Sequence, residues 1–129
     1  MTLTITPIYA GLIGLLFVWL SLRVIGRRQA ARVSVGDGED KELIKRIRAH
    51  SNCAEYAPLA LLLLAMAELQ GAPGWVVHLL GLALLAGRVS HAVGFGRTPQ
   101  IVALRKAGML LTFGVIAMAA LANIGHALI

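Results

Sequence analysis

The chain has 129 residues, 58% of them hydrophobic and only 14% charged, and its mean hydropathy is +0.79. Ordinary globular domains are about 45–50% apolar, and this chain also carries several apolar runs long enough to cross a bilayer. The net charge of +6 does not indicate nucleic-acid binding, because the basic residues are not interleaved with groups that read bases. A single cysteine, Cys53, excludes an intrachain disulfide and a multi-cysteine metal site, and the four histidines lack metal-ligand spacing. We therefore predict an all-α integral membrane protein without a metal.

Four membrane spans are predicted in one domain, residues 1–129, at about 7–25, 43–69, 75–93 and 101–123. The first span has no basic segment before it and is followed by arginines, which is typical of an uncleaved span. Within it Gly11 and Gly14 lie three apart and predict a face where another helix approaches closely. The second helix is expected from about Lys41 to about Leu69, with Glu68 near its end as an interfacial anchor.

The twelve Lys and Arg residues all fall between residues 23 and 48 or between 88 and 106. Cytoplasmic loops of membrane proteins carry an excess of Lys and Arg. Only a four-span bundle with both termini on the non-cytoplasmic side places both basic clusters in the cytoplasm. We therefore predict this topology.

The stretch RIRAHSNCAEYAP, residues 46–58, is where polar groups lead into an apolar helix. At 100° per residue, Arg48, Asn52 and Glu55 fall within about 60° of one another, with Tyr56 at the edge of the same face. Inserting an ionisable residue into a membrane span costs at least ~2.5 kcal/mol, so Glu55 requires either a charged partner or a functional role. Two interpretations remain open at this point. In the first, these residues form an ion pair within the membrane or a helix end that lies in the headgroup region. In the second, they form a ligand-binding face.

Polar groups from all four predicted spans converge on the cytoplasmic half, which indicates a cavity. They are Arg23, Arg27, Arg48, Asn52, Glu55, Arg88, His91 and Arg105. Several arginines favour an anionic ligand, and one Glu among them suggests that the ligand also carries an ammonium group. Alternatively Arg88 pairs with Glu55 and is structural, and His91 is either a ligand donor or an interfacial residue.

Three stretches of the chain carry a resemblance to a known family. RIRAHSNCAEYAP resembles the second-helix motif R-A-x-x-N-x-x-E-Y-x-P of the MAPEG superfamily, the membrane-associated proteins of eicosanoid and glutathione metabolism. GRVSHAVGFGR and LRKAGMLLT extend the similarity to the third and fourth spans. The chain is most similar to small bacterial members, which implies a multi-pass protein of the bacterial inner membrane.

This resemblance implies a homotrimer of four-helix subunits that binds glutathione, as co-substrate, in a cleft between subunits open to the cytoplasm. By motif position, Arg48, Asn52, Glu55 and Tyr56 match residues that hold the tripeptide, and His50 stands where relatives carry another polar contact. Glu55 and Asn52 suit the γ-glutamyl ammonium and its neighbouring groups, while Arg48 suits a carboxylate.

A second carboxylate suits one of Arg23, Arg27 or Arg28, and we take Arg27 as the candidate. Arg105 is the candidate catalytic residue, a cation beside the sulfur that lowers the thiol pKa from about 8.5. His91 can take the place of a hydroxyl donor that relatives carry on the third span. The function implied is a membrane-bound glutathione transferase or peroxidase that detoxifies hydrophobic electrophiles.

Two other functions remain open. His91 and Phe95 stand where conjugating relatives often have tyrosines, which favours a non-catalytic lipid-binding scaffold on the same fold. A small multidrug transporter using Glu55 as a proton-exchanging carboxylate is the third hypothesis. Such exporters typically carry the essential Glu in the first span, and here that span has no acidic residue.

Overall fold

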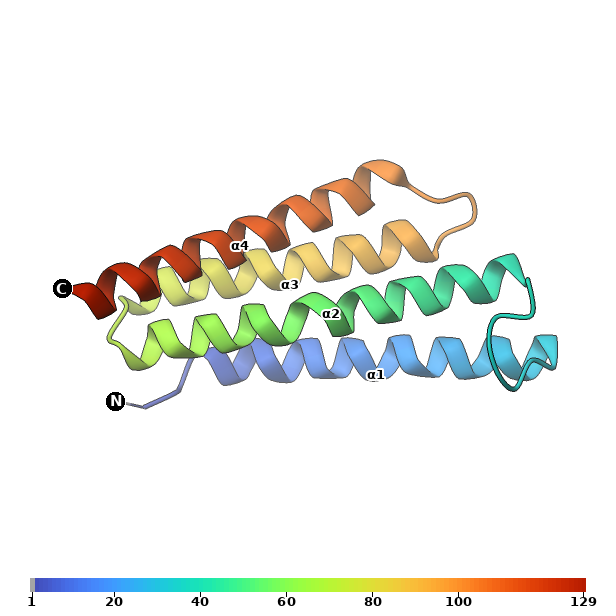
Figure 1. Cartoon of the computed structure of the whole chain (residues 1–129), viewed down its shortest axis with the longest axis horizontal. Coiled ribbons are helices and arrows are strands. Elements are labelled where there is room, and N and C mark those ends of the chain that lie inside the picture. The colour runs from blue at the N-terminus through green and yellow to red at the C-terminus, as the bar shows by residue number, and fades with distance from the viewer. Residues whose placement is uncertain (1) are drawn as a thin grey trace.

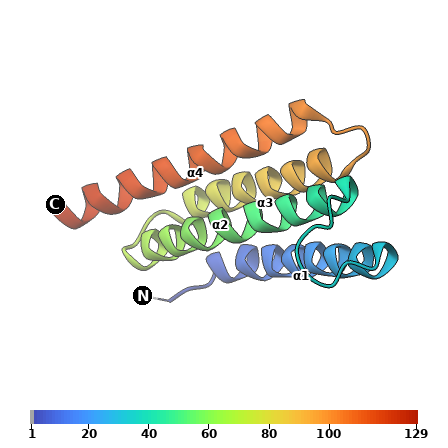
Figure 2. The same ribbon diagram turned by 45° about the vertical axis from the view of Figure 1, so that its right-hand side comes forward.

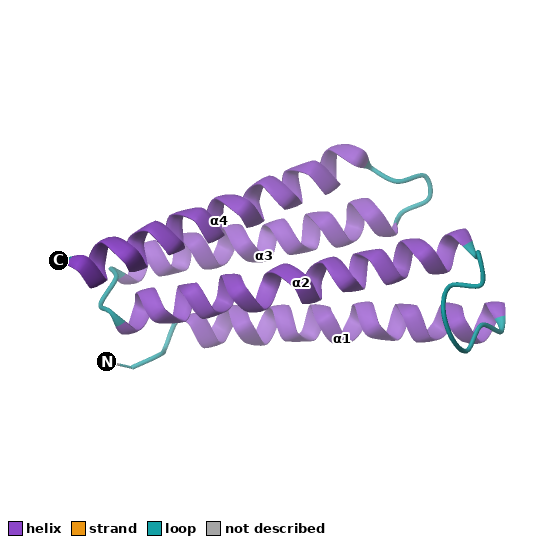
Figure 3. Ribbon diagram, viewed as in Figure 1, coloured by secondary structure: helices purple, strands orange, loops and turns teal. Residues whose placement is uncertain are grey.

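Four long helices make up the computed structural model, which describes residues 2–129. They are α1 (Thr6–Ala31), α2 (Lys41–Leu69), α3 (Gly74–Gly96) and α4 (Val102–Leu128), with no strand among the described residues. The helices run lengthwise beside one another, joined by short connections (Figures 1 and 3). The predicted all-α four-helix bundle is confirmed.

The two ends of the bundle differ in charge. The α1–α2 and α3–α4 loops lie together at one end, while both termini and the α2–α3 turn lie at the other (Figures 1 and 2). Both basic clusters of the sequence flank the first pair of loops, so we call this end of the bundle the basic end. Both clusters therefore lie toward the same side of the bundle.

Each of the four helices is long and apolar enough to cross a membrane. The longest, α2, has 29 residues and is therefore about 44 Å long, against about 30 Å for the hydrocarbon core of a bilayer. Large apolar side chains such as Leu15, Leu110 and Leu121 are about 70% exposed on the outside of the bundle. An apolar exterior of this kind suits lipid rather than water.

The two N-terminal helices begin at acidic caps. Asp40 is the N-cap of α2, and its Oδ1 accepts a hydrogen bond of 2.8 Å from the Leu43 amide. At α1 the cap comes from far along the chain, because the Glu68 carboxylate accepts from the backbone amides of Thr4, Ile5 and Thr6 at 2.7–2.8 Å. Glu68 was expected only to anchor the end of α2, and here it also satisfies the free amides at the start of α1.

The core is built of small and branched apolar residues, and close helix approach occurs at glycines of α3 and α4. A Cβ added at Gly108 would lie 2.5 Å from the Gly87 carbonyl oxygen and 2.7 Å from the His91 amide nitrogen. By contrast, a Cβ at Gly11 or Gly14 would meet nothing within 4 Å. The predicted close approach at Gly11 and Gly14 is therefore wrong within this chain. The tight contact is between α3 and α4 instead, and it positions His91 at the site.

Candidate functional site

A cavity of 470 Å³ opens between α2, α3 and α4. Its polar lining comes from Arg48 and Asn52 of α2, His91 of α3, and Arg105 and Lys106 of α4. Its remaining wall is apolar, formed by Phe95, Val102, Met109 and Leu110. Cations and apolar surface thus line the same space, and no acidic side chain is among its lining residues.

Arg105 is held in the cavity wall by two contacts. Its guanidinium carbon lies 4.0 Å from the centre of the Phe95 ring, which is a cation–π distance. Its Nη1 donates a hydrogen bond of 2.5 Å to Oε1 of Gln100 in the α3–α4 loop. The Nε atom is buried and makes no hydrogen bond within residues 2–129. No hydrogen bond within residues 2–129 uses Nη2, so the oriented guanidinium keeps this donor group for a ligand.

Arg88 lies behind the cavity and is only 1% exposed. One of its terminal nitrogens donates a hydrogen bond to Oδ1 of Asn52, while Nε and Nη1 have no partner in the described chain. Nδ1 of the neighbouring His91, itself 3% exposed, also lacks a partner there. The alternative in which Arg88 pairs with Glu55 is wrong in this structure, because the guanidinium bonds to Asn52 instead.

Glu55 and Tyr56 follow the cavity residues along α2 but do not line the cavity. Glu55 is exposed, and its carboxylate forms no ion pair among residues 2–129. Tyr56 is half-buried and packs edge-on against Phe113 of α4, with the ring centres 5.6 Å apart. Glu55 is three residues beyond Asn52, which is about 4.5 Å along the helix axis. A ligand that extends out of the cavity along α2 can therefore reach this carboxylate.

His50 and Arg27 are not brought to the cavity. Nε2 of His50 lies 3.0 Å from the Ser21 hydroxyl oxygen, and the ring stacks on Phe17, so His50 faces α1. Arg27 forms a two-bond ion pair with Asp40, at 3.0 and 2.7 Å. The hydrogen bonds from the Arg27 guanidinium lower the pKa of Asp40 from 3.8 to about 2.

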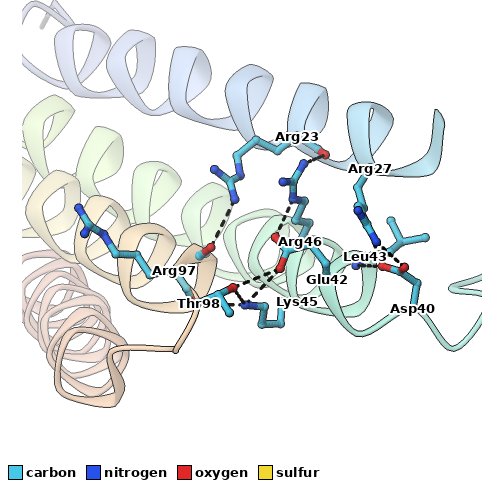
Figure 4. Close-up of polar contacts among 10 residues, drawn as sticks. Arg23, Arg27, Asp40, Glu42, Leu43, Lys45, Arg46, Arg97 and Thr98 are labelled. Carbon is cyan, nitrogen blue, oxygen red and sulfur yellow. Dashed lines mark hydrogen bonds and ion pairs between the residues drawn. The ribbon is translucent and has the colours of Figure 1, made fainter. Parts of the chain in front are cut away.

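Glu42 is the centre of a polar network at the basic end (Figure 4). Its carboxylate accepts from Arg46 at 3.0 Å and lies 3.3 Å from both the Lys45 ammonium and the Thr98 hydroxyl. Lys45 also donates to the Thr98 hydroxyl and to the backbone carbonyl of Arg97. The network ties the start of α2 to the α3–α4 loop, which carries Gln100 toward Arg105.

Four of the predicted site residues therefore meet in one cavity: Arg48, Asn52, His91 and Arg105. Sequence reasoning did not assign Lys106 or Gln100 to the site. Lys106 could have been found, because Val102, Lys106 and Met109 recur at helical spacing on one face of α4. No local signal marks Gln100, whose contact depends on the path of the loop.

Chemically, this arrangement can bind an elongated ligand that carries anionic and apolar parts. Arginine and lysine side chains would meet the anionic groups, and the apolar wall would pack against the apolar part of the ligand. The four helices long and apolar enough to cross a membrane, three of which line this cavity, define a multi-pass integral membrane protein, as predicted.

Comparison with known proteins assigns the family. The model of the MAPEG family matches residues 6–125, and the chain therefore belongs to the MAPEG family. It is 38% identical over 122 residues to the inner membrane protein YecN of Escherichia coli, in strain K12 and equally in strain O6:H1. The aligned part covers 95% of this chain and 92% of YecN. The relative's location agrees with the inner membrane predicted here, and the family assignment argues against a multidrug transporter.

Proposed function

We propose that this protein binds glutathione in the α2–α3–α4 cavity and activates its thiol for reaction with hydrophobic electrophiles. The observation that carries the proposal is the placement of Arg48, Asn52 and Arg105 around one cavity that also has an apolar wall. Its volume of 470 Å³ lies within the range of about 300–1,000 Å³ usual for small-molecule sites.

In this proposal the tripeptide lies along α2. Its carboxylates meet Arg48 and Lys106, and its ammonium reaches the free carboxylate of Glu55. Arg105 lies beside the sulfur, where a positive charge lowers the thiol pKa and raises the thiolate fraction at neutral pH. The thiolate then forms a C–S bond with an electrophilic carbon, and the departing group takes the electron pair.

We further propose that the site is completed by neighbouring copies in a homotrimer. His50 faces α1 and Arg27 belongs to α1, so within one chain neither lines the cavity. In a ring of copies, the α1 side of one subunit can face the α2–α4 side of the next. Light scattering of the detergent-purified protein should then give three times the chain mass.

The test is a glutathione titration of that protein at neutral pH, following thiolate absorbance in the ultraviolet and heat of binding by calorimetry. Wild-type protein should bind glutathione and show a thiolate signal. Arg105→Ala should still bind, but it should lose the signal because the charge beside the sulfur is gone. Arg97→Ala is the matched control, since Arg97 is exposed in the same loop region and does not line the cavity. A thiolate signal that persists in Arg105→Ala would remove Arg105 from the catalytic role.

A second candidate function is a non-catalytic lipid-binding scaffold. A separate, apolar cavity of 250 Å³ between α1 and α2 favours it, with Gly14, Phe17, Cys53 and Pro58 among its lining residues. Absence of both glutathione binding and thiolate signal in the wild-type titration would make this the better account.

A further inference from the structure

Arg88 is the buried charge that the proposed chemistry leaves unexplained. It lies in the membrane-spanning α3 with 1% of its surface exposed and belongs to no ion pair in residues 2–129. Burying a cation without a counter-charge is unfavourable, and such residues in membrane spans mark functional sites. Its one hydrogen-bond partner in the described chain, Asn52, lines the cavity.

The chemistry of this hydrogen bond fixes which way the Asn52 amide points. A guanidinium has five N–H donors and no acceptor, so the Asn52 atom that faces Arg88 must be the carbonyl oxygen Oδ1. The amide nitrogen, Nδ2, then points to the other side of the planar group. Nδ2 makes no hydrogen bond in the described chain, and the Asn52 side chain borders the cavity. Its two N–H donors are therefore available to a ligand.

We infer that Arg88 is a positioning residue that locks the Asn52 amide with its NH₂ group toward the bound molecule, so that Asn52 selects a hydrogen-bond acceptor. The inference rests on the proposed glutathione site and names one feature of its ligand. The resemblance assigned Glu55 and Asn52 together to the γ-glutamyl ammonium and its neighbouring groups. In this inference the group beside Asn52 is a carboxylate or an amide carbonyl. The ammonium belongs one turn further along α2, at Glu55.

The electrostatics of the cavity agree with this orientation. Arg48, Arg105 and Lys106 line the space, Arg88 lies behind it, and no acidic side chain borders it. An acceptor with negative charge is favoured by every one of these groups, whereas an ammonium at the same depth would be repelled. Arg88 therefore contributes twice, by orienting Asn52 and by adding positive potential.

The experiment compares ligand-free thermal stability and glutathione affinity in the same purified variants. Asn52→Asp keeps the shape of the side chain, gives Arg88 a carboxylate and removes the NH₂ donors. We expect it to raise the melting temperature, because a buried charge gains its counter-ion, while weakening glutathione binding at least about tenfold. Asn52→Ala removes the donors without adding charge, and it should weaken binding while lowering stability.

A double-mutant cycle tests the coupling between the two residues. Arg88→Gln should weaken glutathione binding in the wild-type background and cause much less further loss in the Asn52→Ala background. Arg88→Lys, which keeps a donor for Oδ1, should recover part of the affinity. Equal losses in both backgrounds, or wild-type affinity in Asn52→Ala, would overturn the positioning role while leaving glutathione binding in place. A wild-type protein that binds no glutathione would instead overturn the proposed function, and this inference about its ligand with it.

Discussion

At the scale of single residues, three of the six acidic side chains of this protein serve helix ends rather than the cavity. Asp40 caps α2, and Glu68 caps α1. Glu42 joins α2 to the α3–α4 loop at the basic end. None of the three lines the cavity, whose cations are left without acidic partners and so remain available to an anionic ligand.

Asp40 gives a pH prediction with a defined sign. Its pKa falls from 3.8 to about 2 through its hydrogen bonds with Arg27 and lies lower in the folded than in the unfolded protein. This contribution to stability is therefore fully present above about pH 4 and is lost as the pH falls toward 2. Asp40→Asn keeps the cap but removes the charge, so between pH 5 and 2 its melting temperature should fall less than that of wild type. Asp37→Asn, at an exposed acid without an ion pair in residues 2–129, should follow the wild-type curve.

The face of α2 that carries Arg48, Asn52 and Glu55 shows how far a sequence can predict a site. Helical periodicity placed Arg48 and Asn52 on one face, and the structure has both in one cavity. The same periodicity places His50 on the opposite face, and its assignment to the site relied on motif position alone. The orientation of Asn52 was not predictable, because it depends on Arg88, which is 36 residues away in sequence.

At the scale of elements, helix bounds were easier to predict than helix packing. The predicted limits of α2, Lys41 and Leu69, are confirmed. They could be predicted because an acidic cap and a Gln-Gly turn mark them in the sequence. The chain has 14 glycines, however, and nothing in their spacing told which of them lie at helix contacts. Gly87 and Gly108 do, whereas Gly11 and Gly14 do not.

This difference predicts unequal effects of two substitutions in α4. Gly108→Ala places a methyl group 2.5–2.8 Å from atoms of Gly87 and His91, and it should destabilise the protein by about 1–3 kcal/mol. Gly114→Ala, where a Cβ meets nothing within 4 Å, should be neutral or stabilising, because alanine favours a helix more than glycine does. Thermal unfolding in detergent measures both. Equal melting temperatures for the two variants would contradict the tight α3–α4 contact.

At the scale of the whole molecule, the basic end predicts orientation in the membrane. If Lys and Arg face the cytoplasm, both termini lie on the opposite side. Cys53 is the only cysteine and is 2% exposed, so single-cysteine labelling has a low background. In spheroplasts, a membrane-impermeant maleimide should label Ile129→Cys, at the exposed C-terminus, without lysis. Ser34→Cys, in the α1–α2 loop, should react only after lysis, and the reverse pattern would invert the topology.

The Glu68 cap has a consequence for how the chain is made. The carboxylate that completes the start of α1 lies 62 to 64 residues further along the chain, at the end of α2. While the ribosome is still synthesising α2, the free backbone amides at the N-terminus of α1 have no side-chain partner. Once Glu68 has left the ribosome, the start of α1 can be capped without any residue of α3 or α4. Biogenesis can thus begin from a finished two-helix unit onto which the α3–α4 pair docks.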